Sequence, residues 1–291
     1  MGEQMQARTG IIGGSGLYDI QGIEVIDSLD IDTPYGKPSD ELLLARIDGH
    51  EVVFLPRHGR NHATPPHKIN YRANIYAMKL AGVKRIISIS AVGSLREEIV
   101  PGHFVLVDQF VDRTHSREGT FFDGPVVAHV SMADPVCNCL KSSLLKACTS
   151  AGITTHENGS YLVMQGPQFS TRAESELYRS WGMDVIGMTN MPEAKLAREA
   201  EICYATVAMS TDYDCWHEEE EDVSVQSILD IMRGNGMKAQ AMLQSYFSNL
   251  SKDERCSCGC PTALEHGIFA DLKAQSDSAI RPVHALVERF L

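Results

Sequence analysis

The chain has 291 residues and a mass of 32.0 kDa, enough for one large α/β domain or two small ones. Hydrophobic residues make up 43% of it, which excludes a largely disordered protein. The formal net charge of -12 argues against general nucleic-acid binding, because contacts to phosphate backbones need a basic face. No apolar run approaches the ~20 residues of a membrane span, and no secretory signal opens the sequence. We therefore expect a cytoplasmic protein with neither a nucleic-acid nor a membrane partner.

Short apolar runs alternate with helical patterns along the chain, in the manner of βαβ units. Several runs are nearly continuous in Val, Ile and Leu, which indicates strands buried on both faces. The expected strands span residues 9–14, 52–57, 85–90, 103–110, 161–165, 184–188 and 203–212.

Two of the expected helices have clear ends. An apolar stripe from Ala73 to Ala81 stops at Gly82, where a glycine suits the end of a helix. Thr171 and Glu174 have the spacing of a capping box, which predicts that a helix begins there.

Two more helices are expected nearer the C-terminus. Pro192 and Glu193 suit a first helical turn, where a proline loses no hydrogen bond. Ser224 is expected to cap a long helix, which Gly234 and Gly236 are expected to interrupt.

We expect one α/β domain over residues 1–250 and a distinct C-terminal tail over residues 251–291, because no linker-like segment divides the chain earlier. The tail carries Cys256, Cys258 and Cys260, which could bind a metal or form a redox-labile disulfide. Because no CxxC pair occurs in the chain, we favour the disulfide and predict no metal site. The other cysteines are expected to be free buried thiols.

Three turns after expected strands share the donors that a tetrahedral anion needs. They are residues 10–16, which are rich in glycine, residues 57–59 (Arg-His-Gly) and residues 90–94 (Ser-Ala-Val-Gly-Ser). Together they offer backbone N–H groups, hydroxyls, a guanidinium and an imidazole. A dinucleotide site is the alternative, but Asp19 stands where its third glycine would be, and a carboxylate there would face a pyrophosphate. The pattern therefore predicts a site for free phosphate.

A second group of residues suits a purine and its sugar. Phe169 offers an aromatic face beside Ser170, and Met188 can lie against a ribose ring. Asp212 and Asp214 close an apolar strand and point to the same side while the strand persists. Two carboxyl groups in one pocket raise at least one pKa, which leaves a proton for N7 of a departing purine. The alternatives are core packing for Phe169 and Met188, and a solvated loop or cation site for the acid pair.

These blocks, in this order, resemble the trimeric purine nucleoside phosphorylase family and, within it, the 5′-methylthioadenosine phosphorylases. The likeness spans residues 9–250 and includes residues 33–39 and 122–124. It implies a single α/β domain with a central mixed, partly barrel-like β-sheet flanked by helices. It also implies a homotrimer, or a dimer of trimers, with active sites at subunit interfaces. Inorganic phosphate would be a co-substrate, and no cofactor is implied.

The resemblance assigns roles to residues that match the motifs of the family. Phosphate binding falls to Ser15, Arg57, His58, Ser90, Ala91 and Thr189. Substrate binding falls to Phe169, Ser170, Met188, Asp212, Asp214, Val225, Ile228, Leu229 and, from the adjacent subunit, His129. Asp212 and Asp214 are the catalytic pair, and a protonated Asp212 would offset charge at N7. Gln165 and Gln168 stand where many relatives have Glu and Arg, so the charge near the sugar stays open.

The expected reaction is phosphorolysis of 5′-methylthioadenosine to adenine and 5-methylthioribose 1-phosphate, a pentosyl transfer of methionine and purine salvage. The acid pair favours a 6-aminopurine, and the apolar face of Val225, Ile228 and Leu229 favours a 5′-thioether over a hydroxyl. A purine nucleoside phosphorylase or methylthioinosine phosphorylase, acting on 6-oxopurine nucleosides, is the nearest alternative. A non-catalytic nucleotide-binding protein is the alternative from another class.

Overall fold

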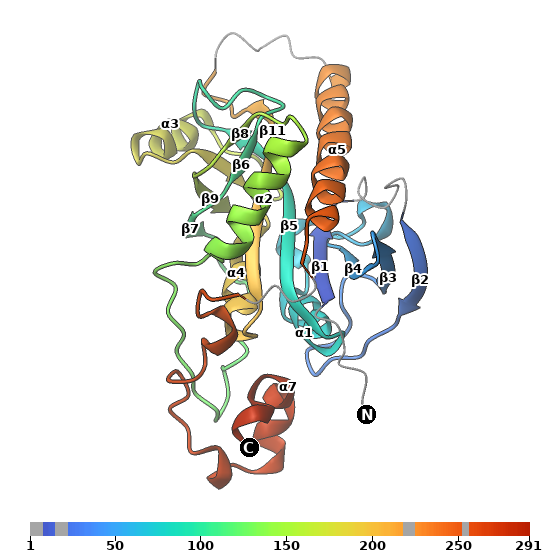
Figure 1. Ribbon diagram of the computed structural model, residues 1–291. Coiled ribbons are helices and arrows are strands. Elements are labelled where there is room, and N and C mark those ends of the chain that lie inside the picture. Colours follow the sequence, from blue (N-terminus) through green and yellow to red (C-terminus); the bar gives the residue numbers. More distant parts are fainter. Residues whose placement is uncertain (1–7, 15–22, 218–224, 252–255) are drawn as a thin grey trace.

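One long strand, β5 (Val83–Ser94), runs through the middle of the molecule (Figure 1). The figure shows the computed structural model, which describes residues 8–14, 23–217, 225–251 and 256–291, with the backbone alone for residues 225–229. β5 pairs in parallel with β1 (Arg8–Gly13) and with β11 (Cys203–Tyr213). Near its carboxyl end it also pairs, antiparallel, with β10 (Val185–Gly187). β5 therefore joins the two halves of the sheet.

Within the described residues the sheet has 11 strands. Its main path follows the order β2, β3, β4, β1, β5, β10, β9, β7, and a branch leads from β5 through β11 and β6 to β8. Parallel and antiparallel pairs both occur, so the predicted mixed sheet is confirmed. The remaining strands are β2 (Glu24–Leu29), β3 (Leu42–Ile47), β4 (His50–Pro56), β6 (Phe104–Leu106), β7 (Gln109–Arg113), β8 (Thr155–His156) and β9 (Ser160–Met164).

Helices cover both faces of the central strands. Among the described residues, no helix is both long enough and apolar enough to cross a membrane. The helices are α1 (Tyr71–Leu80), α2 (Asn138–Ser150), α3 (Arg172–Ser180), α4 (Asn190–Glu199), α5 (Val225–Ser248), α6 (Asp277–Ile280) and α7 (His284–Val287).

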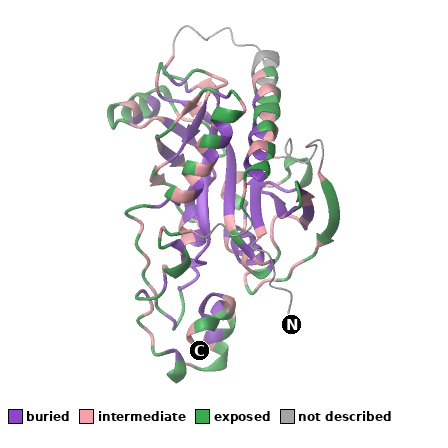
Figure 2. Cartoon of the chain, in the orientation of Figure 1, coloured by how far each residue is buried: buried purple, intermediate pink, exposed green. Residues whose placement is uncertain are grey.

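Successive residues of the central strands point to opposite faces of the sheet. Ile11 and Ile87 belong to a hydrophobic cluster with α2 and α5, whereas Ile12 and Ile86 belong to a second cluster with α1 and α4. Figure 2 shows the central strands almost wholly buried between these layers. The continuous Val, Ile and Leu runs in the sequence reflect this burial on both sides.

The predicted strands are confirmed, with one correction. Residues 103–110, expected as one strand, form β6 and β7, which lie in different arms of the sheet. The chain turns between them at Asp108, whose backbone N–H and side chain both bond to Gly159. β2, β3 and α2 were not predicted; β2 is almost entirely exposed and carries no apolar pattern that would have indicated a strand.

Two helix ends are confirmed. The capping box of Thr171 and Glu174 is present at the start of α3. In α4, Met191 has extended backbone angles, so regular helix begins at Pro192.

The predicted break in the long helix is wrong, because α5 continues through Gly234 and Gly236. A Cβ at either glycine would meet nothing within 4 Å, so packing does not require a glycine at these positions. Each glycine costs about 1 kcal/mol relative to alanine, and the buried stripe that includes Met242 and Leu243 offsets that cost. The predicted cap, Ser224, lies outside the described residues.

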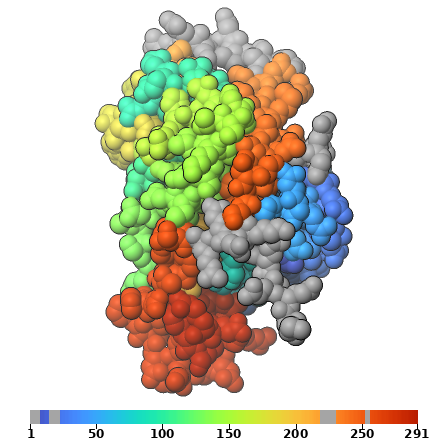
Figure 3. Space-filling model, in the orientation of Figure 1, coloured from blue at the N-terminus to red at the C-terminus, as the bar shows by residue number. Residues whose placement is uncertain are grey.

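The C-terminal segment, residues 256–291, forms the lower end of the molecule (Figure 3). Its apolar side chains, among them Leu264 and Leu286, belong to the same cluster as α1 and α4. Glu201 ties it down, since its carboxylate accepts from the backbone N–H of Leu264 and forms an ion pair with Arg289. The boundary near residue 250 predicted for the domain and its tail falls just after α5.

Candidate phosphate and purine site

The carboxyl ends of four parallel strands meet at one edge of the sheet. β1 pairs in parallel with β4 and β5, and β5 pairs in parallel with β11. Arg57, His58 and Asp214 follow these ends, and Ser90 lies on β5 level with the end of β1, so these residues lie together. In α/β sheets this edge is where ligands usually bind.

The turn between β10 and α4 runs alongside the end of β5. Ile186 is opposite Gly93 in an antiparallel pair, so the chain after β10 passes back along β5. This brings Thr189 beside Ser90, and their hydroxyl oxygens are 3.4 Å apart. Both residues are buried. Two short neutral donors thus lie where the sequence predicted a phosphate site.

Beside these hydroxyls the sheet edge opens to solvent. Ala91 is exposed although both of its neighbours in β5 are buried. Met188 lies next to Thr189 and is half-buried, and Gly166 packs against it. Gly166 has a φ of +65°, and a Cβ there would lie 2.5 Å from the Met188 sulfur, so only glycine fits.

The Arg57 guanidinium forms a fully buried ion pair with Glu193. Its Nε and Nη2 donate to the two carboxylate oxygens over 2.8 and 2.9 Å, and the side chains are 2% and 0% exposed. Burial alone would lower the pKa of Arg57, but the charge and hydrogen bonds of Glu193 outweigh it and raise that pKa. Nη1 makes one hydrogen bond within the described residues, to the carbonyl of Ile89, which leaves one N–H for an anion.

Neutral side chains make further hydrogen bonds to the two charged groups of this ion pair. Ser88 accepts from Arg57 over 2.7 Å and donates to Glu193 over 2.8 Å, and the Tyr204 hydroxyl donates to Glu193 over 2.9 Å. Asn190 in turn donates to both Ser88 and Tyr204. The sequence placed Glu193 only in a helical turn; nothing local indicated its partner, which follows the last residue of β4.

His58 is held as one tautomer. Its Nδ1 lies 2.9 Å from the carbonyl oxygen of Thr64, which can only accept, so Nδ1 carries the hydrogen. Burial lowers the pKa of His58 to about 4, against a smaller opposing effect of the Thr64 bond, so the ring is neutral at pH 7. Neutral His58 therefore presents Nε2 as an acceptor.

The two acids predicted at the end of β11 lie side by side. A Cβ built on Gly93 would be 3.4 Å from Oδ2 of Asp212 and 3.5 Å from Cβ of Asp214, so both border the same glycine. Thr211 donates its hydroxyl to Oδ1 of Asp212 over 2.5 Å. Burial raises the pKa of Asp214, and Glu174 raises it further. The sequence predicted a raised pKa from repulsion within the pair, whereas burial is the main cause of the raised pKa of Asp214 and the repelling carboxylate is Glu174.

Phe169 and Ser170 lie next to the acid pair. The Cys215 thiol, one residue after Asp214, contacts the Ser170 carbonyl over 3.4 Å, and the Ser170 hydroxyl contacts the sulfur of Met164. Phe169 is 81% exposed, which is unusual for a phenylalanine and suits a ring that covers a ligand.

Arg117 is a positioning residue that the sequence analysis missed. Its guanidinium donates to the carbonyls of Met188, Met191 and Gln165 over 2.7–2.8 Å and to the Gln165 side chain over 3.2 Å. It thereby holds the turn after β9 against the turn after β10. Gln165, noted as a departure from the family, supplies two of these four acceptors, its carbonyl and its side-chain oxygen, and Gln168 is exposed.

Some predicted site residues cannot be placed in the same way. Ser15 lies outside the described residues, and for Val225, Ile228 and Leu229 the structure gives the helical backbone alone. His129 is exposed and is not among the groups at the sheet edge. Its backbone N–H donates to Gly267 in the C-terminal segment, over 2.8 Å, and its ring lies edge-on to Phe269.

Comparisons with known proteins agree with this architecture. The model of the phosphorylase superfamily matches residues 8–248. The S-methyl-5′-thioadenosine phosphorylase of Geobacter sulfurreducens is 54% identical over 271 residues, 93% of this chain and 94% of that protein. That of Cereibacter sphaeroides is 48% identical over 288 residues, 99% of each.

Solved structures agree as well. A methylthioadenosine phosphorylase from an antarctic soil metagenomic library superposes with a TM-score of 0.91 at 45% identity, covering 96% of this chain and 98% of that one. The Schistosoma mansoni methylthioadenosine phosphorylase in complex with adenine superposes with a TM-score of 0.84 at 34% identity, covering 90% and 99%. The chain thus belongs to the phosphorylase superfamily, as its fold and its sheet-edge site indicate. Within that superfamily it is a member of the S-methyl-5′-thioadenosine phosphorylases, which confirms the resemblance found in its motifs.

The Arg57–Glu193 pair leads to a stability prediction. Arg57→Met and Glu193→Leu should each destabilise the protein by about 3–5 kcal/mol, because each leaves a buried charge without its partner. The double variant should lose clearly less than the sum of the two, which urea unfolding of all four proteins would measure. The exposed pair of Arg46 and Glu24 is the control, and alanine substitutions there should couple by less than about 1 kcal/mol. Equal coupling in the two pairs would contradict the prediction.

His58 leads to a pH prediction. Its pKa is about 4 in the folded protein and about 6.5 unfolded, so the stability it contributes is complete above pH 6.5 and is lost as the pH falls toward 4. Between these values, the unfolding free energy should rise with pH less steeply in His58→Gln than in the wild type, by the equivalent of up to one bound proton. The control is His266→Gln, a change at an exposed histidine, which should leave the slope as it is. A wild-type slope in His58→Gln would show that the ring is already protonated or solvated.

Proposed function

We propose that this protein catalyses phosphorolysis of 5′-methylthioadenosine. The bond between C1′ and N9 breaks, its electron pair leaves with adenine, and a phosphate oxygen forms the new bond to C1′. One observation carries the proposal: the hydroxyls of Ser90 and Thr189 and the carboxyls of Asp212 and Asp214 flank the last residues of one strand. The three-residue step from Ser90 to Gly93 spans roughly 10 Å, a length that a phosphate ion and a nucleoside fill together.

At the phosphate end, the donors and one acceptor suit hydrogen phosphate. Ser90 and Thr189 donate hydroxyl hydrogens, and Arg57 donates the N–H that Glu193 and Ile89 leave free. Neutral His58 accepts the single P–O–H hydrogen at Nε2, which directs the unprotonated oxygens elsewhere. Ser15 and the exposed residue Ala91 complete this end. The dianion then stabilises the positive charge that develops on the ribosyl ring.

At the purine end, the acid pair manages the charge that appears on adenine. Burial favours a proton on Asp214, so the pair can hold one proton between two carboxyls. That shared proton is on Asp212 when the bond breaks and passes to N7 as the purine leaves, while the ionised Asp214 accepts from the 6-amino group. Ser170 and the exposed ring of Phe169 hold the base, and Met188 lies against the ribose. These directed contacts act without a covalent intermediate.

At the 5′ end, α5 supplies an apolar face. Val225, Ile228 and Leu229 lie at i, i+3 and i+4 of one helix, so they share a side of it. An apolar face accepts a methylthio group, whereas a 5′-hydroxyl buried there without a partner costs about 1–3 kcal/mol. This face sets the preference for the thioether.

We also infer a homotrimer whose subunits complete each other's sites. His129 is exposed, and the C-terminal segment fixes its backbone through Gly267, so the side chain is presented outward on a rigid support. Phe169, which is exposed in the single chain, is the residue that such a histidine from the adjacent subunit would contact. The cytoplasmic location and a pairing of two trimers stay predictions from the sequence.

The decisive assay is adenine release from 5′-methylthioadenosine with and without phosphate. We expect release only with phosphate, and kcat/KM falling about 10- to 100-fold from methylthioadenosine to adenosine, and further for inosine. A preference for inosine would instead identify a 6-oxopurine enzyme. No release, together with tight binding of an intact nucleotide, would favour the non-catalytic alternative.

Asp212 is the residue whose loss should affect chemistry most. Asp212→Ala should lower kcat by ~10²–10³ because one contact made in the transition state is gone, while the unfolding midpoint stays near that of the wild type. The matched control is Asp277→Ala, a change at an exposed aspartate of the C-terminal segment. Wild-type turnover in Asp212→Ala would remove Asp212 from the mechanism.

A further inference from the structure

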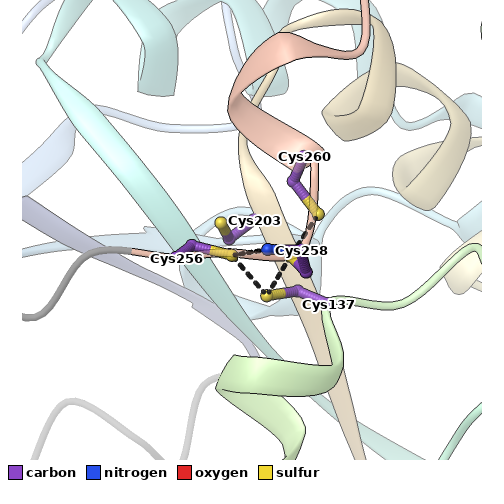
Figure 4. A group of neighbouring side chains, drawn as sticks. All are labelled: Cys137, Cys203, Cys256, Cys258 and Cys260. Carbon is purple, nitrogen blue, oxygen red and sulfur yellow. Dashed lines mark hydrogen bonds between the residues drawn. The ribbon is translucent and has the colours of Figure 1, made fainter.

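Five cysteine sulfurs from three distant parts of the chain meet at one point (Figure 4). Cys137 caps the start of α2, and Cys203 is the first residue of β11. Cys256, Cys258 and Cys260 come from the C-terminal segment. All five sulfur atoms lie within 4.8 Å of one another. None of these residues belongs to the phosphate and purine site.

The spacing of the sulfurs fits a common centre better than a set of disulfides. Sulfur–sulfur distances are 3.4 Å for Cys137 and Cys256, 3.2 Å for Cys137 and Cys258, and 3.2 Å for Cys258 and Cys260. A tetrahedral zinc with Zn–S bonds of about 2.3 Å places its ligands about 3.8 Å apart. A disulfide needs about 2.05 Å, and all five thiols are free. Five thiols also cannot all pair with one another.

Backbone N–H donors and a helix end lie beside two of the sulfurs. The backbone N–H of Leu140 donates to the Cys137 sulfur, and that of Cys258 donates to the Cys256 sulfur, each over 3.4 Å. Cys137 also sits at the amino-terminal, positive end of α2.

We propose that Cys137, Cys203, Cys256, Cys258 and Cys260 form a binding site for one soft divalent cation of the zinc class. Four of the thiols lose their protons to solvent and bind the metal as thiolates, and the fifth remains a thiol. No electrons are transferred. The preference for a disulfide drawn from the sequence weighed three thiols, whereas the structure adds two from other elements.

The position of the site gives it a structural role. The metal would link the C-terminal segment to α2 and to β11, three elements that are far apart in the sequence. That segment also supports His129 through Gly267 and pairs Ile268 with Ala128. Loss of the metal should therefore loosen the C-terminal segment before it affects the sheet.

Elemental analysis of the full-length protein, purified with reductant and without chelator, tests the proposal. We expect close to one zinc per chain. After chelation under reductant, added Co²⁺ should give the absorption of tetrahedral thiolate coordination, and the protein should melt at a lower temperature until metal is restored. No uptake of either metal by fully reduced protein would overturn the proposal. An intact mass lighter by two hydrogens per disulfide, without metal, would do the same.

Variants identify the ligands. Cys258→Ser with Cys260→Ser leaves three thiols, so this double variant should lose the metal, whereas either single change leaves four and should retain it more weakly. The matched controls are Cys148→Ser and Cys215→Ser, which change cysteines outside the group and should bind metal as the wild type does. If the double variant still takes up one Co²⁺ with thiolate absorption, the proposed ligand set is wrong. The readout is metal content and spectrum, so it is independent of the proposed catalytic activity.

Discussion

The buried ion pair of Arg57 and Glu193 is the interaction on which the site depends. It joins the end of β4 to the first turn of α4 across β5, which contributes Ser88 to the network. Two charges removed from water persist in a fold only when their hydrogen bonds are complete, and Ser88 and Tyr204 provide that completion. The consequence is positional: Thr189, just before α4, and His58, just after Arg57, are fixed relative to each other, so an incoming anion meets donors that are already in place.

Arg117 holds neutral backbone carbonyls in place, as Glu193 holds the Arg57 guanidinium. It gathers backbone carbonyls from two turns, one holding Met188 and the other holding Gly166, where a side chain would collide with the Met188 sulfur. The sugar and base contacts predicted on these turns therefore rest on a shared anchor. Both guanidiniums organise the backbone around the site, and rigidity of this kind is what lets polar contacts act in a transition state.

Local signals predicted much of the fold, because they report local interactions. The capping box at Thr171 and the apolar runs that became β1, β4 and β11 are examples. Features that depend on distant pairing were not predictable in the same way: Glu193 meets an arginine 136 residues earlier, and Cys137 meets Cys258 across 121 residues. A pattern read from residues that are close in sequence does not report such contacts. The motifs that resemble a known family compensated for this at the site, where they indicated Arg57, Ser90, Thr189 and the two aspartates together.

The C-terminal segment has a consequence for how the protein is made. Leu264 and Leu286 pack in the hydrophobic cluster to which α1 also belongs, and Ala285 donates its backbone N–H to the Tyr76 hydroxyl. Ribosomes add about 5–20 residues per second, so α1 waits on the order of ten seconds for the residues that cover it. During that interval the side of α1 that packs against α7 is open to water and to other nascent chains. Slow translation or high expression should therefore make this protein depend on chaperones that shield such surfaces.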